Sequence, residues 1–125
     1  MTVVTEQKIN EHDLLDGAAV LYPITKRMLE LAEGGDEHAA VRLNRTLFTP
    51  GYVRLFSDAR PIPRNGGSPE ELPTELDGMR NSVLNAFTYS GIQEEDAQIK
   101  EEFLGYARES GKRIENILTA HGYHI

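Results

Sequence analysis

The fold is decided by residues 94–121, EEDAQIKEEFLGYARESGKRIENILTAH. Side chains in this stretch recur at steps of three and four residues, the spacing of one helical face. They are Ile99, Phe103, Tyr106, Ser110, Ile114, Ile117 and His121. A helix of this length spans about 40 Å at 1.5 Å per residue, and its period is close to a heptad. The stripe therefore has two interpretations, the core of a monomer or the seam of a homodimer. The seam residues would be Ile99, Phe103, Tyr106, Ile114 and Ile117.

Two helical segments come first in the chain. Asn10 is a good helix-capping residue, and apolar side chains with helical spacing follow it as far as Leu31. Pro23 lies inside this run, and its missing N–H predicts a kink or a restart of the helix there. Gly34-Gly35, followed by the capping residue Asp36, predicts a turn before a second helix from Glu37 to Phe48.

Proline and glycine set the remaining boundaries. Thr49-Pro50-Gly51 is predicted to end the second helix, and a short helix carrying Tyr52 and Phe56 follows. Residues 57–67 hold too many prolines and glycines for a helix or a strand, so they predict an exposed crossover loop. A further helix is expected from about Thr74 to Ser90. Gly105 and Gly111 in the last helix predict a bend or the close approach of another backbone.

Taken together, these segments predict an all-α fold. We expect a four-to-five-helix bundle with a long proline- and glycine-rich crossover loop between the second and third main helices. Residues 1–9 lack sustained periodicity and are expected to form a flexible N-terminal arm, whereas residues 10–125 form a single domain.

Composition narrows the classes of function. The 125 residues include no cysteine, which excludes disulfides, thiolate catalysis and cysteine-bound metal sites. The net charge of −7 argues against a protein that coats nucleic acid through bulk positive charge. The sequence has neither the apolar run of a membrane span nor the pattern of a secretory signal. We therefore expect a soluble, acidic, cytoplasmic protein.

Charge is distributed unevenly along the chain. Residues 42–64 hold five arginines and a single acid, Asp58, whereas residues 68–125 hold 11 acidic and five basic side chains. Guanidinium groups bind carboxylates and phosphates through paired hydrogen bonds, so this segment predicts a site for an anionic partner. The predicted contact residues are Arg42, Arg45, Tyr52, Arg54, Phe56, Arg60 and Arg64. The alternative is that the arginines pair with the acidic helices of the same chain or of a symmetric copy.

Signs of catalysis are weak. The chain has no nucleophile elbow, no phosphate-binding glycine loop and no zinc-protease motif. His121 and His124 have a spacing that could bring two imidazoles to one metal ion, but capping of the last helix by His121 is the preferred interpretation. No metal and no cofactor is expected.

Three functions fit these patterns. The first is a small non-catalytic helical protein that binds another macromolecule, expected to be a protein, as an adaptor, inhibitor or assembly factor, and forms a homodimer. The second is an enzyme or sensor that binds a small anionic compound inside the bundle through Arg42, Arg45 or Arg80. The third is an acidic surface over residues 94–115 that mimics nucleic acid and binds a basic protein.

Overall fold

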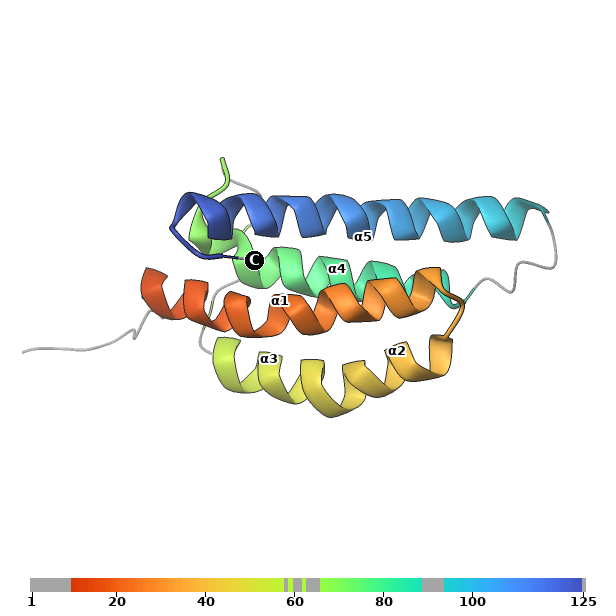
Figure 1. Cartoon of the computed structure of the whole chain (residues 1–125), viewed down its shortest axis with the longest axis horizontal. Coiled ribbons are helices and arrows are strands. Elements are labelled where there is room, and N and C mark those ends of the chain that lie inside the picture. Colours follow the sequence, from red (N-terminus) through yellow and green to blue (C-terminus); the bar gives the residue numbers. More distant parts are fainter. Residues whose placement is uncertain (1–9, 58, 60–61, 63–65, 89–93, 125) are drawn as a thin grey trace, which may run out of the picture.

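A computed structural model describes residues 10–57, 59, 62, 66–88 and 94–124. Every regular element in these ranges is a helix, which confirms the all-α class (Figure 1). The elements are α1 (Glu11–Glu33), α2 (Glu37–Leu43), the π-helical turn η1 (Asn44–Phe48), α3 (Thr49–Phe56), the 3₁₀ turn η2 (Pro69–Glu71), α4 (Leu72–Ala86) and α5 (Glu94–Ala120). The predicted N-terminal arm, 1–9, and much of the predicted crossover loop lie outside the described residues.

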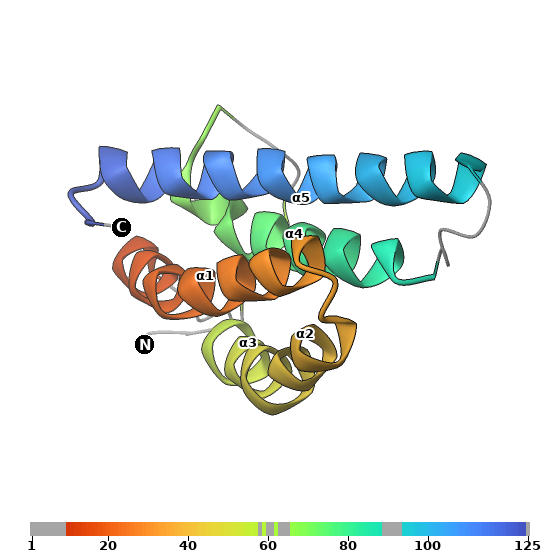
Figure 2. The same cartoon turned by 45° about the vertical axis from the view of Figure 1, so that its right-hand side comes forward.

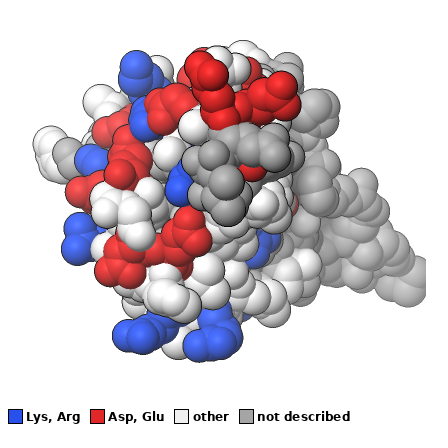
Figure 3. Space-filling model, turned by 90° about the vertical axis from the view of Figure 1, so that its right-hand side faces the viewer, with Lys and Arg blue, Asp and Glu red and all other residues white. Residues whose placement is uncertain are grey.

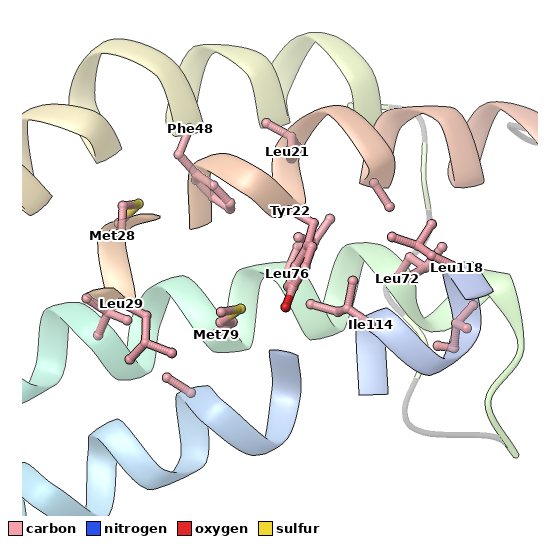
Figure 4. Close-up of a cluster of buried hydrophobic side chains, with 14 of the residues drawn as sticks. Leu21, Tyr22, Met28, Leu29, Phe48, Leu72, Leu76, Met79, Ile114 and Leu118 are labelled. Carbon is pink, nitrogen blue, oxygen red and sulfur yellow. The ribbon is translucent and has the colours of Figure 1, made fainter. Parts of the chain in front are cut away.

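The helices lie in three layers. Figures 1 and 2 show α5 on one side, α1 and α4 in the middle, and α2, η1 and α3 on the opposite side. The most extensive packing is between α4 and α5, and α1 packs against α4, α5 and the α2–α3 segment. Because α1 is sandwiched, apolar side chains are buried on more than one of its faces, among them Leu21, Tyr22 and Met28 (Figure 4).

Helix α1 runs through Pro23 as one element, so the chain does not restart there. The Pro23 side chain is exposed. The helix ends as the glycines predict, because Gly35 adopts a φ of 83° and the Asp36 N–H donates to the Leu31 carbonyl over 2.8 Å. The Asp36 carboxylate then caps α2 by accepting from the Ala39 N–H.

The predicted break at Thr49-Pro50-Gly51 is wrong. Residues 37–56 form one continuous helix, with a π turn, η1, between α2 and α3; we call this element the basic helix. Pro50 has no N–H to give to the Thr46 carbonyl and its ring crowds that carbonyl. The wider turn that precedes it, closed by the Thr49 N–H on the Asn44 carbonyl, lets the helix continue.

The π turn also sets which side chains face outward. A π turn holds one extra residue, so everything after it is set back by about 100° around the axis. In an uninterrupted α-helix, Phe56 would lie about 40° around the axis from Arg42. Arg54 would lie about 120° around the axis from Arg42. With the set-back, Arg54 lies about 20° from Arg42 and Phe56 about 140° away. Accordingly Arg54 is exposed and Phe56 is buried.

Two glycines allow the basic helix to pack closely on α1. A Cβ at Gly17 would meet two ring atoms of Phe56 at 3.0 Å, and a Cβ at Gly51 would meet Leu21 Cδ2 at 2.9 Å. Both distances are below ordinary van der Waals contact. The position of the basic helix therefore depends on the missing side chains at these two sites.

The long helix α5 is partly core and partly surface. Ile114 and Ile117 are buried within the chain, where Ile114 packs beside Leu76 and Leu118 (Figure 4). Gly111 faces Met79 and the Tyr22 hydroxyl, so side chains rather than a backbone approach it, and nothing lies within 4 Å of a Cβ at Gly105. The core interpretation of the stripe thus holds for the C-terminal half of α5.

Candidate functional site

The arginines of the basic helix lie on its outer side, away from α1. Arg42, Arg45 and Arg54 are all exposed, and the π turn brings them to one face. Residues 38–56 contain no acid. Figure 3 shows the end of the molecule at which α2 and α5 begin: basic side chains lie along its lower edge, over the basic helix, and most of the acidic ones lie above them.

These three guanidinium groups have no ion-pair partner among the described residues. The acids nearest in sequence to Arg42 and Arg45 are used elsewhere, since Glu37 pairs with Lys100 and Asp36 caps α2. Within the described ranges, pairing with the acidic helices of the same chain therefore does not account for Arg42, Arg45 and Arg54.

Aliphatic side chains stand beside the arginines. Val41 is 41% exposed and Val53 is 59% exposed; the same angular reasoning places both within about 100° of Arg42. We call Val41, Arg42, Arg45, Val53 and Arg54 the arginine face. The combination of exposed aliphatic groups with arginine is typical of protein–protein interfaces, in which arginine is enriched and lysine depleted. The valines were not predicted, because only the π-turn register places Val53 beside Val41.

The other predicted contact residues lie elsewhere. Phe56 is 3% exposed and belongs to the core, and Tyr52 is half-buried with its hydroxyl donating to the Pro73 carbonyl over 3.0 Å. Burial raises the pKa of the Tyr52 hydroxyl, so it stays neutral at physiological pH. Arg60 and Arg64 lie outside the described residues.

A polar cluster fixes the π turn against α4. Arg80 places its guanidinium 5.1 Å from the centre of the Phe48 ring, donates to the Asn44 side chain over 3.4 Å and pairs with Asp77. Thr49 donates to the same Asn44 oxygen over 3.3 Å. This cation–π contact and its hydrogen bonds hold the turn that orients the arginine face.

The predicted dimer seam is divided by the structure. Ile114 and Ile117 are core residues and are covered within the monomer. Ile99 and Phe103 are half-buried and Tyr106 is 53% exposed, with its ring 6.1 Å from that of Phe103 in an edge-to-face contact. Only the N-terminal half of α5 therefore offers apolar surface to a partner.

A pocket bears on the small-ligand hypothesis. It has a volume of about 420 Å³ and lies between the start of α4 and the last turns of α5. Its walls include the buried Glu71 and Glu75, and Arg113, which pairs with Glu75. Arg42, Arg45 and Arg80, which were predicted to hold an anion, do not line it. The two carboxylates also make its wall unfavourable for an anionic compound.

The remaining observations concern the histidine at the end of α5, possible metal positions and the hydropathy of the helices. The His121 ring nitrogen Nδ1 lies 2.9 Å from the Ile117 carbonyl in the last turn of α5, as the capping interpretation predicts, and Gly122 ends the helix with a φ of 86°. In the described ranges no three histidine or carboxylate side chains converge on a possible metal position. No helix in those ranges combines the length and the hydropathy required to cross a membrane.

Comparisons with protein families, with curated proteins and with solved structures found no match to this chain.

Proposed function

We propose that this protein is a non-catalytic helical bundle that binds an acidic surface of another protein through its arginine face. It would act as an adaptor, inhibitor or assembly factor in the cytoplasm. One observation carries the proposal: Arg42, Arg45 and Arg54 share an exposed face with Val41 and Val53, and no carboxylate among the described residues pairs with the three arginines.

The chemistry of the face favours a protein partner over a nucleic acid. A phosphate backbone is met by dense positive charge, whereas this chain carries a net charge of −7 and would be repelled beyond the local contact. The exposed valines gain free energy only when a partner covers them with apolar groups. Carboxylates spaced along a helix or strand with aliphatic side chains between them satisfy both requirements.

Rigidity supports a binding role for the same face. The Arg80 cluster and the close contacts at Gly17 and Gly51 hold the basic helix in one register, so little ordering cost is left for the backbone on binding. The arginine side chains remain free to adjust. Steering by the three charges should raise the association rate and make it sensitive to salt.

The test is a matched pair of double charge reversals. Arg42→Glu with Arg45→Glu alters the arginine face, and Lys26→Glu with Arg27→Glu makes the same change in net charge at exposed positions of α1. Each variant and the wild type are cross-linked in an extract of the source cells, and the partners are quantified by mass spectrometry. Each partner found is then purified and its binding to the three proteins measured directly. The proposal requires a loss of at least tenfold in affinity with the arginine-face variant alone. Equal affinities for the two variants would refute it.

The small-ligand alternative has less support. Arg42 and Arg45 lie on an outward helical face rather than in a pocket, and Arg80 is engaged with Asp77 and Asn44. The third hypothesis, an acidic surface that mimics nucleic acid, keeps one supporting feature, the acidic N-terminal half of α5.

A further inference from the structure

Helix α5 carries, between Glu95 and Glu109, a second face whose charges have no ion-pair partner among the described residues. Glu95, Ile99, Glu102, Tyr106 and Glu109 follow one another at steps of four and three residues, which places them on one side of the helix within about 40° of a common line. We call them the acidic stripe. All are exposed except Ile99, which is half-buried. Glu95, Glu102 and Glu109 form no ion pair with any described residue.

The acidic stripe and the arginine face are complementary in pattern. Both combine charged and apolar side chains on one side of a helix, and their charges are of opposite sign. From Glu95 to Glu109 the helix rises about 21 Å, and from Arg42 to Arg54 it rises about 18 Å. The two faces are therefore similar in length, and two packed helices can bring carboxylates opposite guanidinium groups with Tyr106 near the exposed valines.

Within one molecule the two faces cannot meet. Figures 1 and 2 place α5 and the basic helix on opposite sides of the molecule, with α1 and α4 between them. The two faces can therefore meet each other only between two molecules. Pairing of two acidic stripes is unfavourable, because it would bring carboxylates together on both helices.

We propose that the occupant of the arginine face in the isolated protein is the acidic stripe of a second copy of this chain. This inference rests on the arginine face of the proposed function. The second copy and an acidic partner protein would compete for that face, and self-association would cover it until the partner displaces the second copy. Because the two faces point in opposite directions, the contact is head-to-tail and does not close as a two-fold dimer. A single pair of helices about 20 Å long buries little surface, which corresponds to a weak contact at the low end of specific interfaces.

The test is sedimentation velocity on the purified protein from about 10 μM to about 1 mM, a range suited to contacts of small area. At low salt the mean mass should rise above the monomer mass of 14.0 kDa as concentration increases. At about 0.5 M salt it should fall back to the monomer, because exposed charges are then screened within a few Å. A wild type that stays monomeric at 1 mM and low salt would overturn the inference.

Charge swapping separates this contact from other modes of association. The triple variants Arg42→Glu, Arg45→Glu, Arg54→Glu and Glu95→Lys, Glu102→Lys, Glu109→Lys should each be monomeric alone. Mixed in equal amounts, they should associate again, because each then offers the sign that the other lacks. Lys26→Glu with Arg27→Glu should associate like the wild type. If the mixture stays monomeric, or if either triple variant associates like the wild type, the inference is wrong.

The proposed function and this inference can fail separately. A monomeric wild type whose arginine-face variant still loses an acidic partner would refute the self-contact and leave the proposed function standing. Self-association that depends on both faces, with partner binding unchanged by Arg42→Glu and Arg45→Glu, would refute the proposed function and support the self-contact.

Discussion

Gly17→Ala tests the packing that positions the arginine face. The new methyl group would stand 3.0 Å from both Cε1 and Cζ of Phe56, whereas carbon atoms in contact prefer about 3.5–4.0 Å. The Phe56 ring is 3% exposed and packs edge-to-face on Tyr52 at 5.3 Å, so it has little room to retreat. Overpacking of this kind costs about 1–3 kcal/mol, and alanine recovers about 1 kcal/mol of helix propensity. We expect the free energy of unfolding to fall by up to about 2 kcal/mol.

The matched control is Gly105→Ala, in the interior of α5. Nothing lies within 4 Å of a Cβ at this position, so the substitution should gain up to about 1 kcal/mol. Urea unfolding of the two variants, followed by circular dichroism, gives the comparison. In a Phe56→Leu background the penalty of Gly17→Ala should shrink, because the ring that it strikes is gone. If Gly17→Ala stabilises the protein as much as Gly105→Ala does, the close approach of the basic helix to α1 is wrong.

Three other predictions concern caps, burial and charge. Gly122→Ala should lower the free energy of unfolding by about 1 kcal/mol in thermal unfolding, since Gly122 has a φ of 86° that alanine tolerates poorly; an unchanged melting temperature would contradict it. Burial, with the Glu115 carboxylate beside it, raises the pKa of Tyr22 above its ordinary 10.0. As pH rises beyond 10, the tyrosine therefore ionises in the unfolded chain first, and the free energy of unfolding falls. In urea titrations at pH 9–12, the free energy of unfolding of Tyr22→Phe should fall less steeply than that of the wild type. Glu75→Gln should lower the free energy of unfolding by about 1–3 kcal/mol, because it leaves Arg113 without its buried carboxylate. A double-mutant cycle with Arg113→Met should show that the two substitutions are coupled. Additive effects would count against the ion pair.

The sequence shows where helices begin and end more readily than it shows which side chains of a helix face outward. Asn10, Gly35, Asp36 and Gly122 mark helix ends that the structure has, because capping chemistry acts over three or four residues and is visible locally. From sequence alone Pro50 predicts a break, because a π turn that lets a helix pass a proline depends on tertiary contacts. Here those contacts come from Arg80, which is 36 residues away in sequence from Asn44.

The candidate site was predicted in part for the same reason. Arginine content alone pointed to Arg42, Arg45 and Arg54, and exposure follows from the helical pattern. Phe56 is predicted as a contact residue because it lies near Arg54 in sequence, and a helix that breaks at residues 49–51 gives no register relating it to Arg42. Val53 is absent from the predicted contact residues because its place beside Arg42 depends on the π turn. The one extra residue of the π turn thus removes an aromatic side chain, Phe56, from the binding surface and brings an aliphatic one, Val53, onto it.

The central claim is that the arginine face is covered by a partner in the cell, and arginine-selective labelling with a dicarbonyl reagent tests it most directly. The folded protein is labelled alone at low concentration and high salt, and again inside source cells, and the modification of each arginine is read by mass spectrometry. We expect Arg42, Arg45 and Arg54 to become several-fold less reactive in cells, while Arg27 of α1, which is also exposed to solvent, keeps its reactivity. Equal labelling of all four arginines in both conditions would contradict it.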